Sequence, residues 1–243
     1  MKKISISLLC FMSFFAFSEN KDGQEFESDV LAFITDTFDI TVSNSNFLDE
    51  RSNDYIFTLS GSYNLNETWR VFGSIDTSEY ADIGFGYSFF MADRIYNEIT
   101  ISAGADTNGT TVYTTGLFSA TKWKSFIFYT NFEGQYIGYE FDTDPYPLTI
   151  EKSEFMFNKL IGSVYEVSSW FSFTVAYGHD KSHYNHWTIN DHSFTTTPQE
   201  TVRDYISLGA IVNLWGVKPN ISHRFDLKNS EENYWDISVS FDF

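Results

Sequence analysis

The sequence predicts an all-β fold, a transmembrane antiparallel up-and-down β-barrel of about 12 strands. Three observations predict it. Apolar and polar residues alternate with a period of two from Val30 to the C-terminus, which is typical of strands with one apolar face. Aromatic residues make up 19% of the chain, and many of them lie at the ends of predicted strands. Short and long connections between strands alternate along the chain, as expected for a barrel with short turns at one rim and longer loops at the other.

The chain begins with the pattern of a secretory signal peptide. Two lysines follow Met1, an apolar stretch runs on to Phe17, and small residues precede the first acidic residue. We expect cleavage after Ser18. The resulting organisation is a signal peptide at residues 1–18, an acidic N-terminal lead-in at 19–29 and the transmembrane β-barrel at 30–243.

Charge and cysteine content narrow the possible functions. The formal net charge of −18 argues against a nucleic-acid partner, because phosphates are bound by lysine and arginine. The single cysteine, Cys10, lies in the predicted signal peptide, so a mature chain would carry no disulfide framework and no cysteine metal site. We expect no cofactor.

The strand pattern is clearest at the C-terminus. There, apolar residues at every second position from Trp235 to Phe243 alternate with aspartate and serine. Lys159 lies among apolar neighbours whichever face is assigned to the lipid, so we expect a bulge near it. The predicted strands are residues 30–45, 55–65, 68–77, 80–90, 97–106, 110–120, 123–138, 152–165, 169–179, 201–214, 217–228 and 233–243.

Joint lengths predict the topology. Outer-membrane barrels have short periplasmic turns and longer external loops. If the last strand ends in the periplasm, every tight joint falls on the periplasmic side, both mature termini are periplasmic, and residues 180–200 form an outside loop. Tryptophans accompany the tight joints, as expected for an aromatic belt at a membrane interface. The tight joints are near 65–68, 120–123, 166–169 and 214–217, and their tryptophans are Trp69, Trp123, Trp170 and Trp215.

The C-terminal segment resembles the terminal signature of Gram-negative outer-membrane β-barrel proteins, with a final Phe243 and apolar residues at alternate positions before it. In those proteins the barrel assembly machinery reads this signature. The resemblance therefore implies that machinery as a partner, outer-membrane lipid as the surroundings, and Trp235, Phe241 and Phe243 as the assembly signal. In size the chain is similar to small twelve-stranded porins, which include oligogalacturonate-specific and nucleoside-specific channels. It lacks the strongly basic lumen of the acid-sugar porins.

The polar face of the strands predicts the lining of a pore. Mixed charges with small neighbours hold water and can orient a polar solute or set an ion preference. We therefore expect a porin-like channel for passive passage of small polar solutes or ions. Two alternatives stay open: the charges pair and fill the barrel, or the barrel displays outer loops that bind a partner or ion. The expected lining residues are Arg70, Asp76, Asp82, Glu98, Glu133, Arg203, Lys218, Arg224, Asp236 and Asp242.

The last two strands predict specific charge pairs. A hairpin centred near Ser230 places Arg224 opposite Asp236 and Lys218 opposite Asp242, with all four charges facing inward. A slip of one residue would turn the apolar face inward and is disfavoured.

Histidines gather in the predicted outside loop. Imidazole suits zinc, copper or nickel, but their spacing matches no fixed motif, so they are weak metal candidates and a solvated loop is favoured. A barrel enzyme of the lipase or protease type is the least favoured alternative, because no histidine and serine share neighbouring positions on one strand face. No catalytic residues are expected. The clustered histidines are His179, His183, His186 and His192.

Overall fold

A computed structural model of the chain describes residues 37–43, 56–92, 94–141, 150–189, 192–196, 202–230 and 233–242. The predicted signal peptide and N-terminal lead-in lie outside these residues, as does Phe243. Within the described ranges, no helix is long and apolar enough to cross a membrane.

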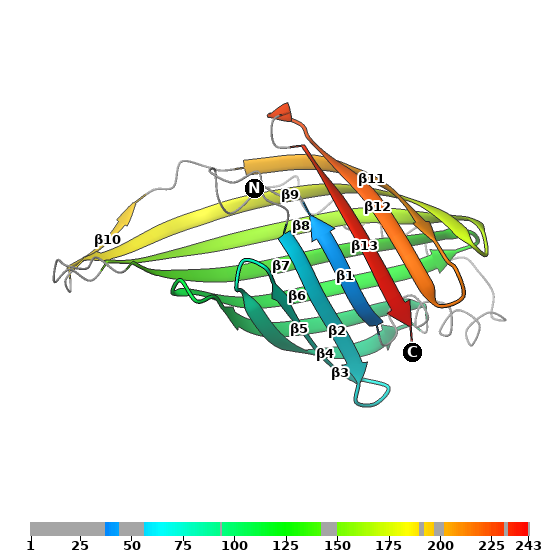
Figure 1. Cartoon of the computed structure of the whole chain (residues 1–243), viewed down its shortest axis with the longest axis horizontal. Helices are drawn as coiled ribbons and strands as arrows, with labels where there is room; N and C mark the ends of the chain where they lie inside the picture. Colours follow the sequence, from blue (N-terminus) through cyan, green and yellow to red (C-terminus); the bar gives the residue numbers. More distant parts are fainter. Residues whose placement is uncertain are drawn as a thin grey trace.

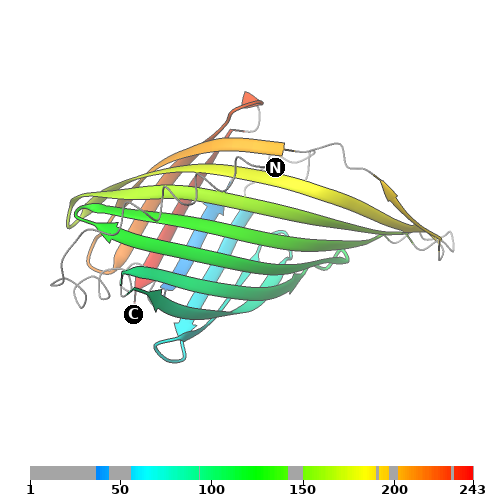
Figure 2. The same ribbon diagram turned by 180° about the vertical axis from the view of Figure 1, so that it is seen from behind.

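The described residues form an antiparallel β-barrel (Figures 1 and 2). Consecutive strands pair with each other, β10 pairs only with the distal part of β9, and β9 continues the ring to β11. The pairing of β13 with β1 joins the last strand to the first, so the ring has 12 strands as predicted. The strands are β1 (Thr37–Ser43), β2 (Ile56–Asn64), β3 (Trp69–Asp76), β4 (Ala81–Met91), β5 (Ile95–Ala105), β6 (Thr110–Trp123), β7 (Phe126–Phe141), β8 (Ile150–Ser168), β9 (Phe171–Ile189), β10 (His192–Thr196), β11 (Val202–Val212), β12 (Val217–Asp226) and β13 (Tyr234–Asp242).

One wall of the barrel is much taller than the other. Strands β8 and β9 have 19 residues each, whereas β3 has 8 and β12 has 10. A tilted strand needs about 9–11 residues to cross a membrane. Strands β7, β8 and β9 therefore continue well past the end of the shorter strands, as Figure 2 shows. This extension overturns the prediction that residues 180–200 are a loop, because β9 runs to Ile189 and β10 pairs back against it.

The two rims differ in part as the lengths of the connections predicted, although residues 77–80 and 106–109 form equally short turns at the opposite rim. At one rim, called here the short-turn rim, strands are joined by residues 65–68, 92–94, 124–125, 169–170 and 213–216, and the start of β1 lies beside the end of β13. The four tryptophans expected at tight joints all lie at this rim with exposed side chains. In the β11–β12 turn, Trp215 and Gly216 both have positive φ, at 53° and 90°. A type I′ hairpin turn requires that combination.

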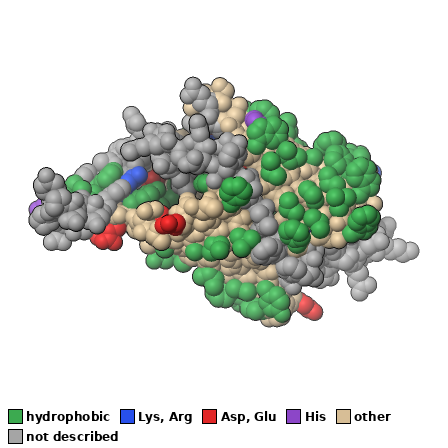
Figure 3. Space-filling view, in the orientation of Figure 1, with side chains coloured by type: hydrophobic (Ala, Val, Ile, Leu, Met, Phe, Trp, Pro, Cys, Tyr) green, Lys and Arg blue, Asp and Glu red, His purple; other side chains and the backbone are tan. Residues whose placement is uncertain are grey.

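The outer surface of the strands is apolar, as alternation predicted. Phe57, Phe85, Phe173, Leu208 and Ile237 are all exposed on it. Figure 3 shows hydrophobic side chains gathered over this surface. An apolar exterior around a closed ring of strands is the arrangement that a lipid bilayer requires, because every backbone group is paired within the sheet.

Aromatic rings fill much of the interior near the short-turn rim. Tyr96 and Ala120 are buried there, and Phe90, Phe118 and Tyr129 pack against them. Glycines on neighbouring strands make room for the inward rings: a Cβ at Gly162 would collide with Tyr129, and one at Gly178 with Tyr205. The inner face is thus partly filled by side chains, so part of the predicted open lumen is packed.

The irregularity expected in the strand that contains Lys159 occurs between Phe155 and Met156, and a second one occurs between Glu166 and Ser168; Lys159 itself lies in regular register. The predicted register of the last hairpin is wrong. In the last hairpin, Arg224 is opposite Tyr234 and Lys218 is opposite Ser240, two residues away from the predicted partners. A shift of two residues keeps every side chain on its face, so the apolar pattern could not detect it.

Candidate channel lumen

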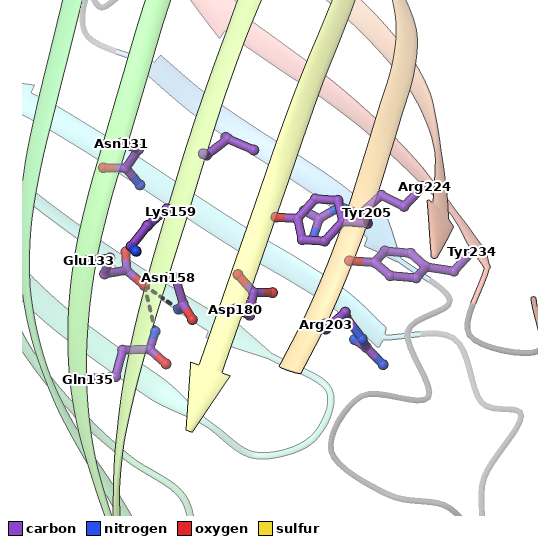
Figure 4. A pocket seen from close by; sticks show the side chains of 11 residues that line it. Asn131, Glu133, Gln135, Asn158, Lys159, Asp180, Arg203, Tyr205, Arg224 and Tyr234 are labelled. Atoms are coloured by element: carbon purple, nitrogen blue, oxygen red, sulfur yellow. Dashed lines mark hydrogen bonds between the residues drawn. The ribbon is translucent and has the colours of Figure 1, made fainter. Parts of the chain in front are cut away.

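A polar cavity of about 320 Å³ lies inside the barrel. Figure 4 shows the side chains that surround it, which come from strands β7, β8, β9, β11, β12 and β13. Strand alternation places ten of the eleven lining residues on the inner face; the eleventh is Lys159, between Asn158 and Leu160. The lining residues are Asn131, Glu133, Gln135, Asn158, Lys159, Leu160, Asp180, Arg203, Tyr205, Arg224 and Tyr234.

Glu133 forms the acidic side of the cavity with two amide side chains. Gln135 Nε2 donates to Glu133 Oε1 at 2.7 Å, and Asn158 Nδ2 donates to the same oxygen at 3.3 Å. Asp180 lies between this group and the arginines (Figure 4). Its direct cross-strand neighbour is Arg203. The carboxylates thus gather on β7 and β9.

Arg224 forms the basic side. Its guanidinium carbon lies 4.9 Å from the Tyr205 ring centroid and 5.0 Å from that of Tyr234. Its Nε is 3.4 Å from Asp236 Oδ2, so the predicted pair of charges forms diagonally across β12 and β13 although the two residues are not directly opposed. Two aromatic faces and one carboxylate hold the guanidinium in place at the cavity wall.

Arg203 adds a second guanidinium beside the cavity. Its Nε is 3.5 Å from Asp226 Oδ2, on the adjacent strand. Carboxylates on β7 and β9 therefore face guanidinium groups on β11 and β12. A transverse separation of charge of this kind orients a dipolar solute and attracts ions of both signs.

On the opposite wall, Arg70 and Glu98 neutralise each other. Arg70 Nε and Nη2 donate to the two carboxylate oxygens of Glu98 at 2.9 Å each. The Tyr96 hydroxyl also donates to Glu98 at 3.3 Å, and Glu98 is only 2% exposed. These two predicted lining residues lie inside the barrel, but they are committed to a packed ion pair.

Asp76 and Asp82 accept hydrogen bonds from backbone amides near the β3–β4 turn. Asp76 accepts hydrogen bonds from the Ser78 and Tyr80 amides, at 2.8 and 3.2 Å, and Asp82 accepts one from the Ser74 amide at 2.7 Å. Burial, reinforced by Asp82, raises the pKa of Tyr80 in this turn to about 12, so its phenol stays protonated. Asp76 therefore shapes the turn, and Asp82 bonds across from β4 to β3.

The remaining predicted lining residues lie away from the cavity. Lys218 is near the short-turn rim on β12, opposite Ser240. Asp242 pairs through its backbone with Thr37, and its side chain lies outside the described residues. The structure thus gathers Glu133, Arg203 and Arg224 around one cavity.

Several cavity residues were missed by the sequence analysis. Asp180 was assigned to a loop because the strand was ended at residue 179, and Asn158 was missed because the face of its strand was ambiguous. Tyr205 and Tyr234 alternate with apolar residues on their strands, which places them inward, but only charged residues were included in the predicted lining.

The three histidines of this group whose side chains are described do not form a common centre. His179 faces outward, where its Nδ1 is 2.6 Å from Asp204 Oδ1. His186 and His192 lie on the β9–β10 extension, and the side chain of His183 is outside the described residues. Within the described part of the chain, no group of three or more metal-ligating side chains occurs. Ser182, the nearest serine to His179 in sequence, is buried on the other face of β9.

Comparisons with known proteins agree in fold alone. No family model matches the chain, and no curated protein matches its sequence. Among solved structures, the NanC porin aligns with a TM-score of 0.61 and 13% identity over 86% of this chain and 100% of that one. The KdgM porin in complex with disordered oligogalacturonate gives 0.57 and 8% over 85% and 99%. An outer-membrane channel from Pseudomonas putida F1 gives 0.53 and 9% over 86% and 93%.

These likenesses define the class of fold. The chain forms a transmembrane β-barrel of the architecture seen in small outer-membrane porins. At such low identities the solutes of those porins do not transfer to this chain.

Proposed function

We propose that this barrel is a passive outer-membrane channel for small polar solutes or ions. The observation that carries the proposal is the polar cavity inside the ring, in which Glu133 and Asp180 face Arg203 and Arg224. A barrel that served only as a scaffold would gain little from exposing both signs of charge to an internal cavity, because each buried charge is costly to desolvate.

The size of the cavity supports a small solute. A volume of about 320 Å³ corresponds to about ten water molecules at about 30 Å³ each. The inward rings of Phe118 and Tyr129 narrow the interior further toward the short-turn rim. Hydrated ions and short polar molecules fit this space better than polymers do.

We also propose the orientation and the route of assembly. Short turns with exposed tryptophans suit the periplasmic rim, so both mature termini would be periplasmic. The barrel assembly machinery is the proposed partner, with Trp235, Phe241 and Phe243 as its signal. Trp235 is exposed on the outer surface of β13, where another protein can reach it.

Liposome swelling tests the channel proposal. Vesicles containing the purified, folded protein should swell in isosmotic solutions of small polar solutes such as glycine or arabinose, and much more slowly in a tetrasaccharide. Vesicles with the heat-unfolded protein are the control. Folded protein that admits no solute would overturn the proposal.

A second candidate is a display barrel. The observation that favours it is the tall wall of β7–β9 with β10 at its tip, which reaches beyond the length needed to cross a membrane. Swelling that equals the control would favour this alternative. We expect no enzymatic activity under either function.

A further inference from the structure

Charged side chains of the cavity form one row across neighbouring strands. Glu133 on β7 is directly opposite Asn158 on β8. Asn158 is directly opposite Asp180 on β9, and Asp180 is directly opposite Arg203 on β11. Arg224 reaches the same cavity from β12, the next strand of the ring. The cavity wall therefore changes from acidic to basic between β9 and β11, over about 5 Å, which is the distance between neighbouring strands.

Asp180 can accept hydrogen bonds that no described residue supplies. Its side chain is half-buried and lines the cavity. Among the described residues, none donates a hydrogen bond to its carboxylate or forms an ion pair with it, although Arg203 is directly opposite. Arg203 and Arg224 interact with its charge across the cavity, beyond ion-pair distance. The carboxylate oxygens of Asp180 are therefore accessible to a cationic group that enters the cavity.

Arg224 has a matching capacity to donate. Its guanidinium lies between the rings of Tyr205 and Tyr234, which hold it through their faces without accepting its hydrogen bonds. Asp236 is 3.4 Å from its Nε, and no described residue accepts a hydrogen bond from Arg224. A guanidinium has five N–H donors and binds a carboxylate through two parallel hydrogen bonds. Arg224 can therefore bind the carboxylate of a solute.

The gap between these two groups fits a short solute. The Tyr205 ring covers Gly178, because a Cβ at that position would collide with it, and Gly178 lies two residues from Asp180 on β9. The Arg224 guanidinium carbon is 4.9 Å from the centroid of the same ring. A step of two residues along a strand is about 6.6 Å, so the charged groups are separated by roughly 7–10 Å. Two hydrogen bonds of about 2.9 Å each, with a small solute between them, fill a gap of this order.

Only one class of small solute satisfies both ends of this gap. An anion can bind Arg224 but is repelled by Asp180, and a cation can bind Asp180 but is repelled by Arg224. A neutral solute of the same shape leaves both charges without an ionic partner in a site partly removed from water, which costs free energy. A solute that carries an ammonium group and a carboxylate on adjacent carbons complements both residues.

We propose that the cavity binds α-amino acids in their zwitterionic form, with the ammonium group at Asp180 and the carboxylate at Arg224. The Tyr205 ring contacts the apolar part of the solute between the two charged groups. The proposal rests on the proposed channel function, because it names the class of solute that the same cavity admits.

Four small molecules of nearly the same shape test the charge requirement. Alanine is a zwitterion, lactate is its anionic counterpart, alaninamide its cationic counterpart and lactamide its neutral counterpart. Saturation-transfer NMR titrations measure the binding of each to the folded barrel in detergent micelles, where no passage across a membrane is needed. The measurement is made at about pH 6, well below the pKa of an α-amino group. Alanine should bind at least fivefold more tightly than each of the other three.

Two variants test the two ends of the site separately. Asp180→Asn should weaken alanine binding at least fivefold and strengthen lactate binding, because the repulsion of the anion is lost. Arg224→Gln should weaken alanine binding to a similar extent and strengthen alaninamide binding. An unfolded variant could not gain affinity for either probe. Glu67→Gln and Lys124→Gln are the matched controls, since they remove the same charges in exposed turns of the short-turn rim, and they should leave alanine binding unchanged.

The results distinguish the solute class from the channel itself. Lactate that binds as tightly as alanine would mean an anion site, and alaninamide that does so would mean a cation site. Either result, or equal binding of all four probes, overturns the amino-acid site even if the vesicles swell and the channel stands. Selective binding of alanine without swelling in any solute would support the site but overturn the channel, and with it the passage of amino acids.

Discussion

The Glu98 carboxylate is buried in the inner wall of the barrel, where Gly86 leaves room for it, since a Cβ at position 86 would collide with its oxygen. Arg70 satisfies both carboxylate oxygens. The sequence could predict that both charges face inward. It could not predict that they bind each other, because Arg70 lies on β3 and Glu98 on β5, and the contact depends on the small residue between them.

Removing Arg70 should destabilise the barrel. Arg70→Ala leaves a buried carboxylate without its partner, which costs about 3–5 kcal/mol in comparable buried pairs. Urea unfolding of the reconstituted barrel measures the change. Arg70→Ala with Glu98→Gln is the control and should recover part of the lost free energy of unfolding, because burying a neutral amide costs less free energy than burying a carboxylate. A single variant as stable as the wild type would show that Glu98 finds another partner or is hydrated.

At the scale of strands, side-chain facing is easier to predict than register. Alternation placed Phe57, Phe173 and Leu208 correctly on the outside. The register of β12 and β13 was wrong by two residues, because that shift leaves each side chain on its face. The length of β9 was also underestimated: its distal part no longer contacts lipid, so it has no apolar face to distinguish it from a loop.

Engineered cysteines test the register of the last hairpin. Ser222 is directly opposite Asp236. Ser222→Cys with Asp236→Cys should therefore form a disulfide under mild oxidation, since directly opposed Cβ atoms lie about 4.5–5.5 Å apart. Arg224→Cys with Asp236→Cys is the comparison and should crosslink less. Gel mobility after limited proteolysis reports the bond. Preferential crosslinking of the second pair would restore the register expected from the sequence.

At the scale of the whole molecule, the fold could be predicted from sequence patterns that recur from strand to strand. Period-two alternation, alternating joint lengths and tryptophans at the tight joints predicted a closed barrel of 12 strands. The cavity depends on distances between strands far apart in sequence, such as β7 and β12, and on which inward charges pair. These distances are set by the diameter and tilt of the ring. Of the nine expected lining residues whose side chains are described, three line the cavity: Glu133, Arg203 and Arg224.

Orientation in the membrane is tested by labelling intact cells. Ser230 lies in the β12–β13 connection and Ser169 in the β8–β9 turn, at opposite rims. A membrane-impermeant maleimide should label Ser230→Cys on whole cells and should label Ser169→Cys only after the outer membrane is ruptured. The reverse pattern would invert the proposed topology, and both the periplasmic termini and the role of the tryptophan-bearing rim would then be wrong.

The central claim is that ions pass the charged cavity. The reversal potential measured in a planar bilayer tests this claim most directly. In a salt gradient, the wild-type protein should give discrete conductance steps. Arg224→Glu should shift the reversal potential toward cation selectivity, because Arg224 lies on the cavity wall between Tyr205 and Tyr234. Lys124→Glu makes the same charge change in the exposed β6–β7 turn and should shift it much less. Folded protein without conductance, or an unchanged potential in Arg224→Glu, would contradict the account.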